Sequence, residues 1–190
     1  MTIATNAGIL LFAVQICLQA QSGFTPMTGE ERRNVYFKRL FSPVSLAGSA
    51  VGVGISQWRD RPHEWPQGAK GYGYRYANSY GQHVIRETLM FASGSVLHED
   101  YRYFRSGEQG TRNRILYAVK GSFMARGDDN RRHVSISRIG AYAGAALISR
   151  SWHPDSTRNF RSAGIAFGTS MGISMGFNVL REFWPRKKKP

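Results

Sequence analysis

Residues 164–179 read GIAFGTSMGISMGFNV, and this stretch decides the fold. Gly164, Gly168, Gly172 and Gly176 recur four residues apart, and no charged side chain interrupts the stretch. On an α-helix, residues four apart lie nearly above one another, so the glycines would form one thin stripe that lets another backbone approach closely. The spacing therefore predicts a helix whose glycine face packs against a neighbouring helix.

The same residues also alternate with a period of two. Small or polar residues fall on one side, and larger, mostly apolar residues fall on the other. Alternation of this kind is typical of a strand in an outer-membrane barrel. Periodicity within this stretch does not separate helix from strand, so a small outer-membrane-type β-barrel is the alternative fold.

The rest of the chain favours helices. Residues 41–57 and 135–152 repeat the four-residue glycine spacing, and residues 75–97 carry apolar side chains at helical spacings of three and four. An eight-stranded barrel needs about eight alternating segments, and only one is well formed here. We therefore expect an all-α bundle of about five helices packed through glycine-rich faces, with further short helices near residues 29–40 and 114–125. The expected packing glycines are Gly48, Gly52, Gly140, Gly144, Gly164, Gly168, Gly172 and Gly176.

At 190 residues the chain has the length of one domain with a leader. Residues 1–20 contain an apolar run of signal-peptide length and are expected to form a signal peptide or an N-terminal anchor. Residues 21–185 would form a single helical domain, and residues 186–190 a basic tail. Each glycine-bearing segment ends in a tryptophan, a residue that favours the boundary between apolar and polar phases.

The chain is strongly basic, with 26 Lys and Arg against 12 Asp and Glu and a net charge of +14. Twenty of the basic residues are arginines, whose guanidinium groups form paired hydrogen bonds with phosphate and carboxylate groups. A secreted protein rarely meets nucleic acid, so anionic lipid is the expected ligand. The residues expected to bind lipid or another anion are Arg102, Arg105, Trp184, Arg186, Lys187, Lys188 and Lys189.

One group of residues suggests chemistry. His83 and Glu87 are four apart on an expected helix, and His98 lies at its end. Two imidazoles and a carboxylate can hold a metal ion that activates water, so a metal-assisted hydrolase is an alternative function. The competing interpretation is structural: His83 would be hydrogen-bonded between helices, while Glu99 and Asp100 would pair with nearby arginines. The single cysteine, Cys17, lies in the leader and offers no thiolate metal site.

Four short motifs resemble a family of uncharacterised bacterial proteins with predicted signal peptides. They are Trp65-Pro66-Gln67-Gly68, Gly81-Gln82-His83, His98-Glu99-Asp100-Tyr101-Arg102-Tyr103 and Arg181-Glu182-Phe183-Trp184-Pro185. The resemblance implies a bacterial cell-envelope location, either periplasmic or membrane-associated. The resemblance implies no activity, no cofactor and no catalytic residue.

These observations together predict a membrane-associated envelope protein with a structural or interaction role. It would bind anionic lipid, or it would assemble as a homo-oligomer through glycine-faced helices. The residues favour a non-enzymatic role and leave catalysis open.

Overall fold

The computed structural model describes residues 24–185. The expected signal peptide or anchor at residues 1–20 and the basic tail at residues 186–190 lie outside the described residues. The helices and strands of the described part are α2 (Gly29–Leu40), α3 (Pro43–Trp58), α4 (Gly68–Val96), α5 (Thr111–Lys120), β1 (Met124–Arg126), β2 (Arg132–Val134), α6 (Ile136–Ile148), the 3-10 turns η1 (Ser149–Trp152) and η2 (Asp155–Thr157), and α7 (Phe160–Phe183).

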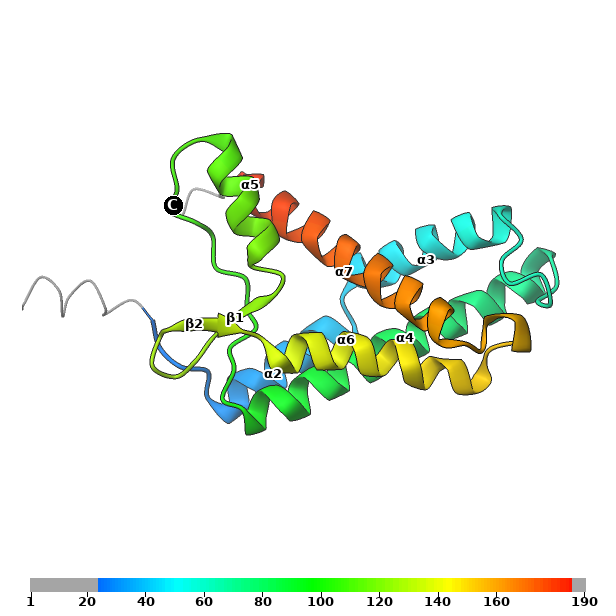
Figure 1. The fold of residues 1–190 in the computed structure, drawn as a ribbon, viewed down its shortest axis with the longest axis horizontal. Helices are drawn as coiled ribbons and strands as arrows, with labels where there is room; N and C mark the ends of the chain where they lie inside the picture. Colours follow the sequence, from blue (N-terminus) through cyan, green and yellow to red (C-terminus); the bar gives the residue numbers. More distant parts are fainter. Residues whose placement is uncertain (1–23, 186–190) are drawn as a thin grey trace, which may run out of the picture.

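The predicted all-α bundle is confirmed (Figure 1). Within residues 24–185 the only sheet is the short antiparallel pair β1–β2, so the alternative of a β-barrel is wrong. Helix α4 is the centre of the molecule, because α2, α3 and α6 all pack against it, while α7 packs against α5 and α6. The helical spacing of apolar residues in 75–97 had already indicated α4, which now proves to begin seven residues earlier.

The early start of α4 has a steric cause. Residues 59–74 combine glycines and prolines with polar side chains, a composition typical of a loop, yet residues 68–74 form the first two turns of α4. The preceding chain crosses this helix so closely that a Cβ on Gly71 would overlap the carbonyl oxygen of Pro66. The glycine that suggested a loop is therefore required for a close approach within a helix.

Local sequence signals fix the ends of the other helices. Thr28 and Glu31 form a capping box at the start of α2, with both reciprocal hydrogen bonds present. Ser42 caps α3, and Pro43 occupies its first position, where a missing N–H costs nothing. The sequence of residues 41–43 therefore determines where α2 ends and α3 begins.

The buried carboxylate of Glu99 caps the N-terminus of α6. Glu99 accepts hydrogen bonds from the backbone N–H of Ile136 (3.0 Å) and of Ser137 (3.2 Å), and from the Ser135 hydroxyl (2.7 Å). An anion at this position satisfies the unpaired N–H groups of the helix and complements its dipole. Burial by itself would raise the pKa of Glu99, but the hydrogen bonds from Ser137 and Ser135 outweigh it and lower the pKa. The expected pairing of Glu99 with an arginine is therefore wrong.

The predicted packing role of the glycines is largely wrong within the chain. Only Gly144, where a Cβ would lie 2.8 Å from the Cδ1 of Leu89, is pressed against another helix. A Cβ on any of the other seven would meet no atom of another element within 4 Å. Helix α7 instead packs through Ala163, Met171 and Asn178, so its glycine stripe faces outward. The outward-facing glycines are Gly48, Gly52, Gly140, Gly164, Gly168, Gly172 and Gly176.

The apolar core is small. Met90, Tyr101 and Ala141 form its buried cluster, with Val35 and Leu89 packed against them. Many large apolar side chains lie at the surface instead; Trp58 is 83% exposed and Phe160 is 87% exposed. Two segments, Gly29–Trp58 and Phe160–Phe183, are long and apolar enough to cross a membrane by length and composition, and little of either is buried in the chain.

Candidate functional site

A cleft of about 850 Å³ opens between α3 and α7. Helix α3 packs on α4, and α7 packs on α6, so the α4–α6 pair forms the floor between the two walls (Figure 1). Small residues keep the walls thin: Gly48 and Gly52 line the α3 side, and Ser170 and Ser174 line the α7 side. The volume lies within the range of pockets that take ligands, roughly 300–1,000 Å³.

The lining changes character with depth. Four exposed lining side chains are apolar, namely Val44, Val51 and Ile55 on α3 and Ile173 on α7, each at least 50% exposed; the exposed polar ones are Arg61, Thr169 and Arg181. Most of the deeper lining side chains are polar or charged, and the buried Met90 and Tyr101 and the half-buried Phe177 lie among them. The half-buried and buried polar lining residues include Ser45, Ser49, Asn78, Ser79, Gln82, His83, Glu87, Arg138, Ser170, Ser174 and Asn178.

Arginines from four helices meet at one end of this cleft. We call Arg39 (α2), Arg86 (α4), Arg138 (α6) and Arg181 (α7) the arginine cluster. Glu87 is the one acidic side chain in the described lining of the cleft. It lies 3.7 Å from the Nη1 of Arg39 and 3.4 Å from the Nε of Arg86.

The guanidinium groups of the cluster are held close to one another. Arg39 (3.3 Å) and Arg138 (2.7 Å) both donate a hydrogen bond to the backbone carbonyl of Tyr101. Burial, together with the nearby charges of Arg39 and Arg181, lowers the pKa of Arg138 to about 10. One carboxylate against four guanidiniums leaves an excess of positive charge. This excess is costly at the buried Arg138 and the half-buried Arg39 and Arg86, whereas Arg181 is exposed at the end of α7.

Arg181 differs from the other members of the cluster. Arg39, Arg86 and Arg138 each donate hydrogen bonds within the protein, whereas Arg181 has no hydrogen bond or ion pair to any residue from 24 to 185. Its guanidinium lines the cleft from the last turn of α7. It is therefore the member whose donors are available to a bound anion.

The opposite end of the cleft is closed by a different arginine. The side chain of Arg75 is 2% exposed and donates to the carbonyl oxygens of Arg61 (3.0 Å), Pro62 (3.0 Å) and Pro66 (2.9 Å). Its donors are used in holding the 59–67 loop on α4, so it has a structural role.

The proposed metal ligands do not come together. His83 and Glu87 face one another, with 3.9 Å between Nδ1 and Oε1, but His98 follows the last turn of α4 and pairs with Asp128 at 3.0 Å. Fifteen residues of helix separate the two histidines by about 22 Å. Within residues 24–185 no three His, Cys, Asp or Glu side chains gather as metal ligands would, so the predicted site is wrong.

His83 has the structural role named as the competing interpretation. Its Nε2 donates to the carbonyl of Arg39 at 3.0 Å, and its Nδ1 accepts from Arg86 at 2.6 Å. Burial and the neighbouring Arg86 charge lower the pKa of His83, which keeps the imidazole neutral. Both ring nitrogens are thus occupied, and neither has a lone pair left for a metal ion.

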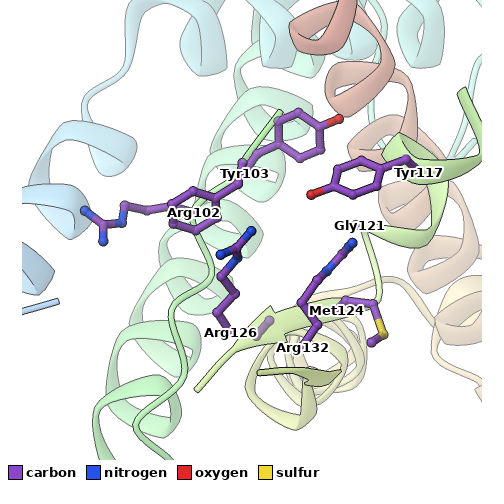
Figure 2. Close-up of a pocket in the computed structure, with 9 residues that line it drawn as sticks. Arg102, Tyr103, Tyr117, Gly121, Met124, Arg126 and Arg132 are labelled. Carbon is purple, nitrogen blue, oxygen red and sulfur yellow. The ribbon is translucent and has the colours of Figure 1, made fainter. Parts of the chain in front are cut away.

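The arginine-aromatic run at residues 101–105 is also mostly structural. Arg102 is paired with the buried Asp100 at 2.6 Å, as the competing interpretation predicted, and has little freedom to bind lipid. Arg126 lies against the ring of Phe104, 4.6 Å from its centroid. Figure 2 shows Arg132 rising from the hairpin toward the ring of Tyr117. The Arg132 guanidinium lies 4.4 Å from the centroid of that ring. The pocket between these side chains is about 20 Å³, room for a water molecule and no more.

Two expected anion-binding residues stay accessible. Trp184 is 67% exposed just beyond α7, and Arg105 is half-buried in the loop before α5. The remaining expected residues, Arg186, Lys187, Lys188 and Lys189, lie outside the described residues. The tryptophans that end α3 and α7 are both at the surface, and Trp152, which is 41% exposed, also donates its indole N–H to Asn78 at 2.9 Å.

Sequence reasoning missed the arginine cluster. Its members are separated by up to 142 positions, and only the packing of α2, α4, α6 and α7 brings them together. One signal was present: Arg138 is an isolated charge in an otherwise uncharged helix, which is where a charge needs a special partner.

Comparison with known proteins adds no assignment. Neither the family models, nor the curated proteins, nor the solved structures contain a match to this chain.

Proposed function

We propose that the protein is a membrane-associated component of the bacterial cell envelope that docks on an anionic lipid surface through α3 and α7. The observation that carries the proposal is the exposed apolar surface of these two helices beside a cationic cleft. Monomeric soluble proteins rarely expose apolar patches larger than a few hundred Å², and larger ones mark interaction sites. The envelope location rests on the resemblance of the four sequence motifs.

The placement of exposed side chains supports docking by an extended face. Trp58 ends α3, Phe160 begins α7, and Ile165 lies one turn further along α7; all three are more than 60% exposed. Burial of such a side chain in lipid is worth about 1.5–3 kcal/mol. Basic residues near the surface of an anionic membrane add about 1 kcal/mol each, and the chain has a net charge of +14.

Vesicle flotation tests the proposal. The full chain is mixed at low salt with vesicles of phosphatidylglycerol and phosphatidylcholine, or of phosphatidylcholine alone, and centrifuged through a density gradient. We expect flotation with the anionic vesicles and about tenfold weaker binding to the neutral ones. Ile165→Asp should weaken binding about ten- to hundredfold, whereas Gln109→Asp, an exposed loop position, should leave it unchanged. A chain that stays at the bottom with both vesicle types would refute the proposal.

A second copy of the chain is the other partner that these faces suit. The stripe of Gly164, Gly168, Gly172 and Gly176 is exposed along α7, and thin stripes of this kind let two helices pair in lipid. Chemical cross-linking in anionic nanodiscs separates the two partners. A cross-linked dimer that Gly168→Leu abolishes would show assembly through this stripe, and a monomer in nanodiscs would leave lipid as the partner.

A further inference from the structure

We infer that the cleft between α3 and α7 seats the headgroup of one anionic phospholipid, with its phosphate at the arginine cluster and its acyl chains leaving between the two helices. The inference rests on the proposed function, because it takes the ligand from the lipid surface on which that function places the protein. It goes further by naming the lipid class, the residues and the orientation.

The orientation follows from the order of the lining. Apolar side chains such as Val51 and Ile173 form much of the exposed rim, while most of the half-buried and buried lining consists of hydroxyl, amide and guanidinium groups. An amphiphile that entered tail first would place its acyl chain against polar groups and leave those groups unsatisfied. Entry of the headgroup matches polar with polar and leaves the acyl chains against the apolar rim.

The arginine cluster supplies the phosphate site. Arg181 is exposed and has donors that no residue from 24 to 185 uses, and Arg39, with its side chain 28% exposed, is near enough to add its charge to the partial desolvation that lowers the pKa of Arg181. Guanidinium groups bind phosphate oxygens through pairs of parallel N–H donors. A phosphate here would neutralise part of the charge that Glu87 alone leaves unbalanced.

The polar floor next to the cluster points to a headgroup with hydroxyls. The Oδ1 of Asn78 already accepts from Gln82 (3.1 Å), Trp152 and His153 (2.9 Å each), which fixes the amide. Its Nδ2 and the Ser79 hydroxyl have no protein partner among residues 24–185. From Asn78 to Arg86 helix α4 rises about 12 Å, enough for a phosphate and a glycerol group side by side.

The zwitterionic lipids fit less well. A choline or ethanolamine group would bring a cation beside Arg86 and Arg138, where positive charge is already in excess. Phosphatidylglycerol carries one negative charge and two hydroxyls, and it is the probe that matches the lining.

Native mass spectrometry of the full chain in non-ionic detergent tests the inference without a membrane. The protein is given equimolar phosphatidylglycerol and phosphatidylcholine with identical acyl chains, and the detergent is removed in the instrument. We expect one phosphatidylglycerol molecule per chain and at least tenfold less retained phosphatidylcholine. Arg181→Gln should reduce retention about tenfold or more, because a hydrogen-bonded ion pair is lost. Arg181→Lys should recover part of it, and Arg161→Gln, at the other end of the same helix, should match the wild type.

Several results would overturn the inference. Equal retention of both lipids would mean an apolar groove with no headgroup site. Absence of retained lipid, or equal losses for Arg181→Gln and Arg161→Gln, would refute the site as well. Saturation by glycerol 3-phosphate at the same concentration as phosphatidylglycerol would identify a site for a small soluble anion instead of a lipid.

The two proposals fail separately. If Arg181→Gln loses lipid in detergent but still floats with anionic vesicles, both hold. If the wild type floats but retains no lipid, surface docking survives and the headgroup site does not. If the wild type retains phosphatidylglycerol but does not float, the site survives and surface docking does not.

Discussion

Replacing Gly168 and Gly172 together by alanine will make the isolated protein more stable. Both glycines lie in the middle of α7, are exposed, and offer open space for a Cβ, so the new methyl groups clash with nothing. Glycine in a helix interior is roughly 0.5–1 kcal/mol less favourable than alanine, because it loses more conformational freedom on folding. The pair should therefore gain about 1–2 kcal/mol.

Urea unfolding, followed by circular dichroism at 222 nm, measures this gain. With a denaturant slope of about 2 kcal/mol/M, the midpoint should rise by about 0.5–1 M. The matched control is Gly144→Ala on α6, where the new Cβ would lie 2.8 Å from the Cδ1 of Leu89. Because that methyl group must displace a packed side chain, the control should gain less or lose stability.

A loss of stability in the double variant would contradict this reasoning. It would show that the α7 stripe is in close contact with something outside the described chain, and a concentration-dependent loss would identify a second copy. The outcome therefore also decides between the two partners considered for this face.

Three further effects are expected. Gly71→Ala should destabilise the protein by about 3 kcal/mol or more, because its Cβ would overlap the Pro66 carbonyl, and thermal melting should show a markedly lower midpoint. Glu99→Gln should cost about 3 kcal/mol in urea unfolding, since it removes a buried charge that caps α6; Glu108→Gln, at an exposed position, should cost almost nothing. Burial and the charge of Arg150 lower the pKa of His153 to about 4. The unfolded chain then binds a proton that the folded chain does not, so about 3 kcal/mol of stability should be lost as pH falls from 6.5 to 4, with no further loss from this group below pH 4. His153→Gln should flatten that part of the pH profile, and an unchanged slope would contradict the assignment.

The sequence was most informative where a local rule decides the structure. The helical spacing in α4 and the four-residue glycine spacing in α7 both gave correct helices. The short hairpin β1–β2 escaped prediction, because strands of three residues carry too little periodicity to be recognised.

The sequence predicted that the glycine-rich segments are helices, but it did not predict what their glycine faces contact. Glycine spacing shows that a helix has a thin face, but it does not say whether that face meets another helix of the same chain. Gly144 packs against Leu89, whereas Gly172, in the same kind of pattern, faces outward. The difference depends on where α4 lies, which is a property of the whole fold.

The candidate site could not be predicted for the same reason. His83 and Glu87 attracted attention because they are neighbours on one helix, and they do lie 3.9 Å apart. However, His83 is a neutral hydrogen-bonded imidazole, and Glu87 pairs with Arg39 and Arg86. The arginine cluster joins four helices, and none of its members has a sequence neighbour that marks it. Isolated charges in apolar segments, such as Arg138, were the one usable signal.

The small apolar core has a calorimetric consequence. The heat-capacity change of unfolding grows with the apolar surface newly exposed to water, and a compact domain of this size would show about 2 kcal/mol/K. Here the buried cluster is Met90, Tyr101 and Ala141, while many large apolar side chains already face outward. Unfolding in water would hydrate little additional apolar surface. We therefore expect a low heat-capacity change and a broad, flat stability curve, with a stability that varies less with temperature than is usual for a chain of this length.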